Sequence, residues 1–145
     1  MIKELTNPTQ QEIEKIAQLW LASNLEAHDF VAADYWRGNY SEVKEMLPNA
    51  QLFVYSDEGE LAGFMGLMEG YIAGIFVKKE YQQQGIGRAL LAEAMSRNEK
   101  LTLAVYKQNQ QAYRFYVKQG FTVEAERIDP QTDEVEYQMS WTRNA

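Results

Sequence analysis

Two glycines, Gly85 and Gly87, stand between a run of strand-forming residues, Tyr71–Val77, and a stretch with the apolar spacing of a helix. The first amides of a helix have no backbone partners and carry partial positive charge, so a loop that enters a helix binds anions well. Glycine lets phosphate oxygens approach the backbone without meeting a Cβ. Arg88 adds a cation in the first turn, where it opposes the helix dipole, and an anionic ligand is one explanation. The segment predicts a phosphate-binding turn; the alternative is a glycine-containing turn with no ligand.

The residues around this turn exclude two common nucleotide sites. A Walker loop needs Gly-Lys followed by Ser or Thr, whereas Gly87 is followed by Arg88 and Ala89. A dinucleotide fingerprint needs a third small residue where Leu90 stands, and an acidic residue about 20 positions further on. That region is Thr102–Lys107, which contains no acid. A nucleotide-binding protein is therefore disfavoured.

The chain has no cysteine and a single histidine, His28. Without cysteine there is no disulfide, thiolate nucleophile, zinc–thiolate site or iron–sulfur cluster. One histidine removes every two-histidine metal motif. A Ser-His-Asp triad would depend on His28, and no G-x-S-x-G elbow accompanies it. We predict no metal site.

Size and charge narrow the partners. The 145 residues make about one domain, and 46% are hydrophobic, as in a globular protein. With 21 acidic and 14 basic residues the net charge is −7, which should repel nucleic acid and attract cationic substrates such as amines weakly. No apolar run approaches the roughly 18 residues of a membrane span, and Met1–Leu5 lacks a signal peptide's apolar region. We expect a cytoplasmic protein that binds neither nucleic acid nor membrane.

Caps and breakers divide the chain into alternating strands and helices. Asn7 and Pro8 supply an N-cap and an N1 proline for the first helix, Gly59 suits a left-handed hairpin position, and Gly74 marks a bulge or a close backbone approach. The expected strands are Ile2–Thr6, Leu52–Tyr55, Leu61–Leu67, Tyr71–Val77, Leu101–Val105, Phe121–Asp129 and Glu134–Trp141. The expected helices are one from Asn7-Pro8 to about Ala27, one or two short ones in Asp29–Met46 broken near Gly38 and ended by Pro48, one from Gly87 to about Asn98, and Gln110–Gln119 stopped by Gly120. This order predicts an α/β fold with a mixed sheet.

Two motifs on these elements resemble the GNAT superfamily of acyl-CoA-dependent N-acyltransferases. One is Gln82-x-x-Gly85-x-Gly87, directly after the fourth strand; the other is Asn109, Ala112, Phe115-Tyr116 and Gly120-Phe121. Residues 24–30 and Met46-Leu47-Pro48 further resemble the small bacterial YjaB-like branch, often described as peptidyl-lysine acetyltransferases. The resemblance covers nearly the whole chain. It implies a single N-acetyltransferase domain over residues 1–145, with a mostly antiparallel central sheet, splayed strands and helices on both faces.

The resemblance also implies a site for acetyl-CoA, as co-substrate, in the gap between Tyr71–Val77 and Leu101–Val105. Backbone groups of Ile75, Phe76 and Val77 would pair with the pantetheine amides like an added strand. The amides from Gln83 to Arg88 would hold the pyrophosphate, and Asn109 would hydrogen-bond the cofactor or, alternatively, only cap its helix. The implied cofactor-binding residues are Ile75, Phe76, Val77, Gln82, Gln83, Gln84, Gly85, Ile86, Gly87, Arg88, Asn109 and Tyr116.

Without cysteine, direct attack of a primary amine on acetyl-CoA in a ternary complex is the simpler route. A lysine-like amine with a pKa near 10.4 costs about 4.6 kcal/mol to deprotonate at neutral pH, so a base or a water chain must take its proton. Glu69 and His28 are the candidate bases; their alternatives are a solvated strand-end charge and a packed, helix-end histidine. Tyr116 would donate a proton to the departing thiolate, or else be a core aromatic beside Phe115. Backbone donors near Gly74 would stabilise the oxyanion.

The acceptor side is less defined. The segment Asp29–Leu47 covers the expected cleft opening, and Trp36, Tyr40 and Tyr71 are candidate pocket residues that equally suit a core. A small-molecule amine, a protein lysine and a protein N-terminus all fit as acceptors, and the protein could be a monomer or a homodimer. The alternative function is a non-catalytic acyl-CoA-binding sensor module.

Overall fold

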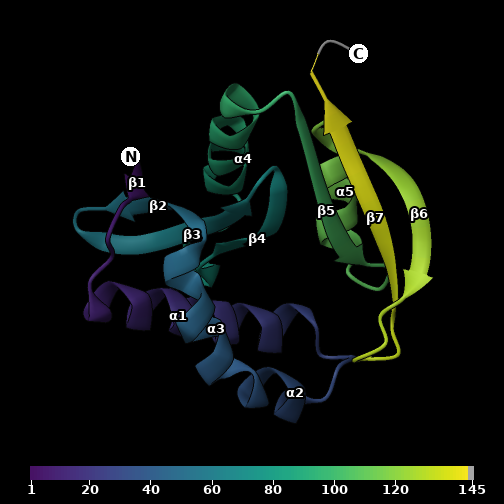
Figure 1. Cartoon of the computed structure of the whole chain (residues 1–145), viewed down its shortest axis with the longest axis horizontal. Helices are drawn as coiled ribbons and strands as arrows, with labels where there is room; N and C mark the ends of the chain where they lie inside the picture. Colours follow the sequence, from purple (N-terminus) through teal and green to yellow (C-terminus); the bar gives the residue numbers. More distant parts are fainter. Residues whose placement is uncertain (144–145) are drawn as a thin grey trace.

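A seven-stranded sheet in the order β1-β2-β3-β4-β5-β7-β6 organises the computed structural model, which describes residues 1–143 (Figure 1). Residues 144 and 145 of the predicted single domain lie outside this range. Neighbouring strands are antiparallel except β4 and β5, which are parallel. The predicted mixed, mostly antiparallel sheet is confirmed. The strands are β1 (Ile2–Leu5), β2 (Gln51–Asp57), β3 (Glu60–Met68), β4 (Tyr71–Val77), β5 (Lys100–Tyr106), β6 (Thr122–Ile128) and β7 (Val135–Thr142).

Helices cover both faces of this sheet, as expected. Strand residues alternate between the faces, so in β2 Phe53 packs in the cluster with α4 and α5, while Leu52 and Val54 pack with α1. No helix within residues 1–143 is both long and apolar enough to cross a membrane. The helices are α1 (Gln10–Ala27), α2 (Ala33–Gly38), α3 (Tyr40–Met46), α4 (Ile86–Arg97) and α5 (Gln110–Lys118), with 3₁₀ turns η1 (Leu47–Asn49) and η2 (Lys79–Tyr81).

Strands β4 and β5 diverge almost from their first residues (Figure 1). Their ladder consists of one pair, Tyr71 opposite Thr102, supported by a hydrogen bond from the Thr102 amide to the Gly70 carbonyl at 2.9 Å. On its other edge β4 has a bulge, because Gly74 pairs with Gly66 whereas Ile72 pairs with Leu67. The predicted splayed strands and the predicted irregularity at Gly74 are both confirmed. The gap widens toward Val77 and Tyr106.

The start of α1 differs from the sequence prediction. Asn7 is not the N-cap: it lies before the helix with a left-handed φ of 52°. Thr9 caps α1 in a capping box, in which the Glu12 amide donates to the Thr9 hydroxyl at 3.1 Å and the Thr9 amide donates to the Glu12 carboxylate at 2.8 Å. This reciprocal pair satisfies two groups at once, which Asn7-Pro8 does not offer. The other predicted helices begin and end close to their expected residues.

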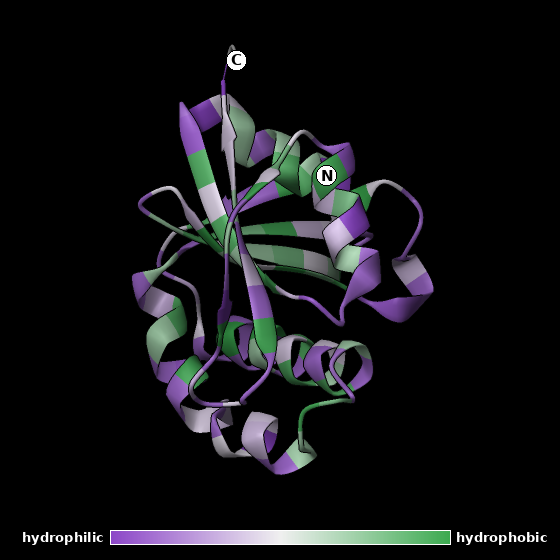
Figure 2. Ribbon diagram, turned by 90° about the vertical axis from the view of Figure 1, so that its right-hand side faces the viewer, coloured by the Kyte–Doolittle hydropathy of each residue, from purple (hydrophilic) through white to green (hydrophobic). Residues whose placement is uncertain are grey.

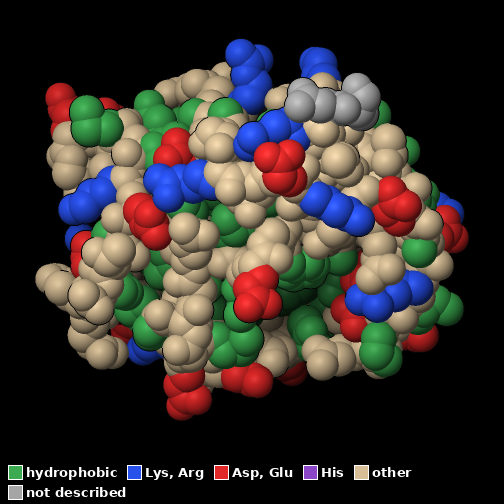
Figure 3. Space-filling view, turned by 45° about the horizontal axis from the view of Figure 1, so that its top comes forward, with side chains coloured by type: hydrophobic (Ala, Val, Ile, Leu, Met, Phe, Trp, Pro, Cys, Tyr) green, Lys and Arg blue, Asp and Glu red, His purple; other side chains and the backbone are tan. Residues whose placement is uncertain are grey.

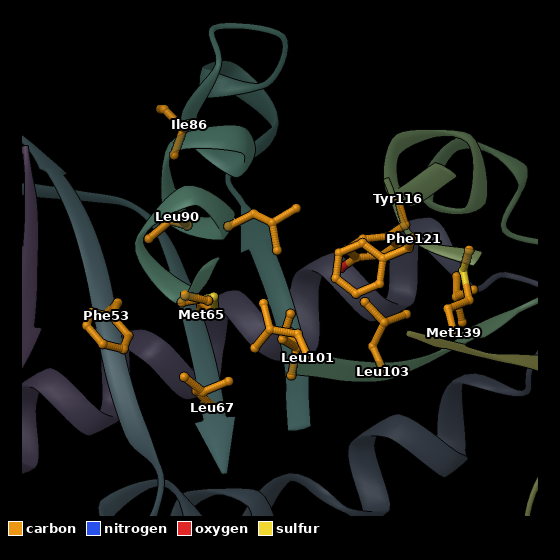
Figure 4. Close-up of a cluster of buried hydrophobic side chains, with 14 of the residues drawn as sticks. Phe53, Met65, Leu67, Ile86, Leu90, Leu101, Leu103, Tyr116, Phe121 and Met139 are labelled. Atoms are coloured by element: carbon orange, nitrogen blue, oxygen red, sulfur yellow. The ribbon is translucent and has the colours of Figure 1, made fainter. Parts of the chain in front are cut away.

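The larger core lies between the sheet and the helices α4 and α5 (Figure 4). Leu90 and Leu91 of α4 and Leu101 of β5 are fully buried there. Tyr116 and Phe121 join this cluster from α5 and the turn after it, where Gly120 has a left-handed φ of 100° and ends the helix. The central strands are mostly hydrophobic, whereas hydrophobic and hydrophilic residues alternate along the helices (Figure 2). The core therefore anchors the elements on both sides of the gap.

Replacing Thr9 by Ala should lower the free energy of unfolding by about 1 kcal/mol, because the Glu12 amide loses its acceptor. The melting temperature should fall by about 2–4 °C. Thr9→Ser keeps the hydroxyl and should retain most of the stability. Urea titration of the three proteins measures the effect; a Thr9→Ala protein as stable as wild type would contradict the capping box.

Candidate active site

Unpaired backbone amides line the loop that leads into α4. Among residues 1–143, the amides from Gln83 to Arg88 donate no hydrogen bond; the first helical bond runs from the Ala89 amide to the Gly85 carbonyl at 3.0 Å. Gln83 and Gly85 have left-handed φ values of 64° and 82°, which turn successive amides outward. This is the geometry of an anion site. The free donors that the predicted phosphate-binding turn requires are thus present, and the binding of a phosphate by them stays a prediction.

The glycines and Gln82 shape this loop. The Gln82 side chain donates from Nε2 to the Val77 carbonyl at 3.1 Å and so ties the loop to the end of β4. A Cβ on Gly85 would meet no neighbouring atom, and one on Gly87 would meet only the Phe115 ring at 3.7 Å. Packing therefore does not require glycine at either position. Glycine is required at Gly85 by the left-handed backbone conformation, and at both positions it leaves the amides accessible to a ligand. Ile86 points into the core, while Arg88 is exposed.

The edge of β4 that faces the gap offers alternate peptide groups. The Lys78 amide donates to the Ala62 carbonyl at 2.8 Å, and β4 is antiparallel to β3 with Phe76 opposite Phe64. In such a ladder every second residue bonds its partner strand, so Phe76 faces β3 while Ile75 and Val77 face the gap. The expectation that Phe76 also offers its backbone to pantetheine does not fit this register. Its ring instead covers Gly74, where a Cβ would overlap it.

Tyr116 lies on α5 with its ring in the core and its hydroxyl free of protein partners. The ring packs against Phe115 and Phe121 at centroid distances of 5.1 and 5.5 Å, and the side chain points away from α5 into the core cluster (Figure 4). Burial, and to a smaller extent Tyr71, raises the pKa of the hydroxyl, which therefore stays protonated at neutral pH. Within the described chain the hydroxyl makes no hydrogen bond. Tyr116 is thus a core aromatic that retains an uncommitted proton.

The GNAT acetyltransferase domain model matches residues 48–123, which include the amide-lined loop and Tyr116. Peptidyl-lysine N-acetyltransferase YiaC of Escherichia coli K12 is 37% identical over 134 residues, covering 91% of this chain and 92% of the relative. The chain belongs to the GNAT acetyltransferase family. Peptidyl-lysine N-acetyltransferase YjaB of the same strain is 33% identical over 124 residues, covering 85% of this chain and 84% of YjaB. The solution structure of apo-form YjaB from Escherichia coli superposes with a TM-score of 0.83 at 29% identity, covering 97% and 96% of the two chains.

This acetyltransferase uses acetyl-CoA and transfers its acetyl group to an amine, so it is an enzyme rather than the sensor alternative. Within the described residues no group of three His, Asp or Glu side chains is placed to hold a metal ion. The matched region includes all of the predicted cofactor-binding residues.

His28 is half-buried at the end of α1 with both ring nitrogens engaged. Its Nδ1 lies 2.8 Å from the Asn24 Oδ1, and its Nε2 lies 2.9 Å from the Asn109 Nδ2. Burial lowers the pKa of the imidazole to about 4. A base role for His28 does not fit this geometry, because no lone pair is free for a substrate proton. The packed, helix-end alternative describes its position.

Asn109 caps α5, since its Oδ1 accepts from the Ala112 amide at 3.2 Å. The N-cap interpretation is confirmed, and a contact with the cofactor stays a prediction. Glu69, the other candidate base, is exposed in the turn between β3 and β4, at the paired end of the gap. Its position fits the solvated strand-end alternative as well as a base that exchanges protons with water.

The three candidate acceptor-pocket residues lie in different environments. Trp36 is buried at 7% exposure against His28 and Trp20, Tyr40 donates to Glu14 at 3.0 Å, and Tyr71 is 43% exposed beside the gap. A cavity of about 210 Å³ between α1, α2, α3 and the β6–β7 loop is bounded by Trp20, Tyr35, Trp36, Asn39, Glu42, Val43, Met46 and Gln131.

One face of the molecule is hollowed, with hydrophobic side chains inside and acidic ones beside the hollow (Figure 3).

Asn24 and Tyr106 contact His28 as well, although their residue types did not predict it. Asn24 is a buried polar residue, at 3% exposure, one helical turn before His28; that spacing was the available signal. Tyr106 packs its ring against His28 at 5.1 Å and donates to Asp129 at 2.9 Å. Nothing local in the sequence indicates this contact, because the two residues come from different elements.

Replacing Gly85 by Ala should weaken coenzyme A binding about tenfold or more, since the left-handed backbone resists a Cβ and the amides turn away. Gly59→Ala is the matched control: Gly59 has φ 83°, open space around it and a place in the β2–β3 turn. Both variants should lose about 1 kcal/mol of folding stability. Calorimetry with coenzyme A separates them, and equal affinities would contradict the amide-lined site.

The half-buried imidazole of His28 should make the free energy of unfolding depend on pH. Because the pKa of His28 in the folded protein, about 4, lies below its ordinary value of 6.5, the unfolded chain binds the proton first as the pH falls. Wild type should therefore lose on the order of 3 kcal/mol relative to His28→Gln between pH 7 and pH 4. Urea titrations of both proteins measure this difference, in which the shared carboxylate titrations cancel. A difference that does not change with pH would contradict a neutral His28.

Proposed function

We propose that this acetyltransferase acetylates the side-chain amine of lysine in proteins. The observation that carries the proposal is the similarity to two relatives named as peptidyl-lysine N-acetyltransferases, at 37% and 33% identity over most of the chain. The net charge of −7 adds a weak attraction for basic segments of a protein.

In the proposed mechanism the backbone holds the co-substrate. The amides from Gln83 to Arg88 bind the pyrophosphate, and the outward peptide groups of Ile75 and Val77 pair with the pantetheine amides. Both sets of groups lack backbone partners in the strands and helices around them, so binding satisfies donors that water would otherwise have to hydrate. Acetyl-CoA supplies the thioester whose carbonyl carbon the lysine nitrogen attacks.

Proton transfer accompanies the exchange of bonds. The lysine ammonium first loses one proton to a base or to water, and its neutral nitrogen then attacks the acetyl carbon. As the carbon–sulfur bond breaks, the nitrogen releases its second proton to solvent and the Tyr116 hydroxyl gives its proton to the departing thiolate sulfur. Tyr116 then regains a proton from solvent, so the net products are the acetylated lysine, coenzyme A and one released proton. The raised pKa of Tyr116 keeps that proton in place until the sulfur takes it. Of the two predicted bases, Glu69 keeps an exposed carboxylate, so Glu69 or water receives the lysine proton.

Replacing Tyr116 by Phe should lower kcat about a hundredfold, because a general acid contributes this order of rate enhancement. The Kd of coenzyme A should stay within about twofold, since the ring remains in the core. Tyr113→Phe is the matched control, because Tyr113 lies on the same helix and packs its ring against Tyr137. Thiol release with a lysine peptide gives the rates, and equal turnover of wild type and Tyr116→Phe would remove Tyr116 from the mechanism.

The acceptor is tested with peptides that carry one lysine and a blocked N-terminus, compared with the same peptide with a free N-terminus and no lysine. Mass spectrometry should locate the acetyl group on the lysine side chain. Acetylation of the N-terminal amine alone would overturn the proposed acceptor.

A further inference from the structure

A chain of hydrogen bonds crosses the open end of the gap between β4 and β5. It begins at the Trp20 carbonyl, which accepts from the Asn24 Nδ2 at 2.9 Å, and continues from Asn24 to His28 at 2.8 Å. His28 then meets Asn109 at 2.9 Å, and Asn109 accepts from the Ala112 amide at 3.2 Å. The chain therefore connects the last turn of α1 to the first turn of α5.

The two ends of this chain fix the direction of every bond in it. The Trp20 carbonyl only accepts, so the Asn24 amide group faces it and the Asn24 oxygen faces His28, whose Nδ1 must carry the hydrogen. The Ala112 amide only donates, so the Asn109 oxygen faces it and the Asn109 nitrogen donates to the His28 Nε2. Both ends specify the same neutral tautomer, and no member is left with a mismatched group.

The hydrogen bonds connect the β3–β4 side of the gap with the β5 side, which the sheet connects through one residue pair. α1 packs on β3 and β4, whereas Asn109 follows β5, and the β4–β5 ladder is the single pair Tyr71–Thr102 at the opposite end of the gap. Asn109 and Tyr116 are two helical turns apart, so they share a face of α5. At the other end of α5 the Phe121 amide donates to the Tyr116 carbonyl at 3.0 Å. At its first turn α5 is held to β5 by the Asn109 amide, which donates to the Tyr106 carbonyl at 2.9 Å, and the bond to His28 adds a second link, to α1.

We propose that His28 is a positioning residue: by accepting from Asn109 it fixes the first turn of α5, and thereby the place of the Tyr116 hydroxyl. The proposal rests on the proposed role of Tyr116 as proton donor. It gives the single histidine of the chain a task in the reaction without contact with the reacting atoms.

The surroundings of His28 keep its ring neutral and in place. Its ring stacks on Trp36 at 5.4 Å and meets Phe30 and Tyr106 edge-on at 5.6 and 5.1 Å. The titratable side chain among these neighbours is Tyr106, from β5, whose hydroxyl donates to Asp129. From α1 and α5 the ring meets the uncharged Asn24 and Asn109. Burial lowers its pKa, so at neutral pH the Nε2 lone pair stays available to Asn109.

The first test compares His28→Gln with His28→Phe. A glutamine carboxamide has a donor and an acceptor, like the neutral imidazole, whereas phenylalanine preserves the ring but neither bond. Under the proposal, His28→Gln keeps kcat within about threefold of wild type, and His28→Phe loses about tenfold or more per folded molecule. A loss of a hundredfold or more in both variants would instead indicate a base, and full kcat in His28→Phe would show that the bonds position nothing that the reaction needs.

The second test uses Asn109→Asp, which keeps an oxygen to cap α5 but places an acceptor against Nε2. The connection then forms only with protonated His28, so the pKa of His28 should rise well above 4 and kcat should fall as the pH is raised through that new value. Because His28 is the single histidine, its imidazole proton resonances report the titration directly. An unchanged titration in Asn109→Asp would overturn the connection. This titration does not depend on turnover, so its failure is distinguishable from a failure of the Tyr116 step.

Discussion

The site depends on the near-absence of hydrogen-bonded pairing between the neighbouring strands β4 and β5. Parallel strands β4 and β5 share one residue pair and then separate, so the facing edges carry peptide groups with no partner strand. Unpaired backbone groups in a protein interior are costly, and an extended ligand with amides of its own satisfies them as a third strand would. The bulge at Gly74 bends β4 away, and the large core beneath α4 and α5 holds the two strands apart. The gap thus lies beside a bulge in β4 and above the core that α4 and α5 share with the sheet.

Backbone geometry, more than side-chain charge, prepares the anion site. The amides from Gln83 to Arg88 lack acceptors because Gln83 and Gly85 take left-handed conformations just before α4 begins. Ile86 anchors the loop in the core, and Gln82 ties it to Val77, so the donors are held before any ligand arrives. This pre-organisation lowers the entropy lost on binding. In the proposed mechanism these amides allow a chain with net charge −7 to bind a polyanionic co-substrate.

Much of the site followed from the sequence because its motifs are local. The glycines of the loop, the caps of α5 and the bulge at Gly74 each depend on a few neighbouring residues, and the structure bears them out. Asn7 was wrong as the cap of α1 because Thr9 and Glu12 form a better-satisfied pair. The prediction that Phe76 faces the gap together with Ile75 and Val77 is wrong. The side of β4 to which each peptide group points depends on the register with β3, and the sequence of one strand does not reveal that register.

The amino-acid sequence by itself determined the family, the use of acetyl-CoA, the absence of cysteine chemistry and the order of the elements, because these depend on residue types and short spacings. Only the tertiary structure decided what His28 does. Its partners come from four different elements: Asn24 from α1, Asn109 from the start of α5, Trp36 from α2 and Tyr106 from β5. The direction of each hydrogen bond is set by the backbone groups at the two ends of the series of hydrogen bonds. A side chain whose protonation is controlled by contacts between distant elements acquires its role only when those elements pack together.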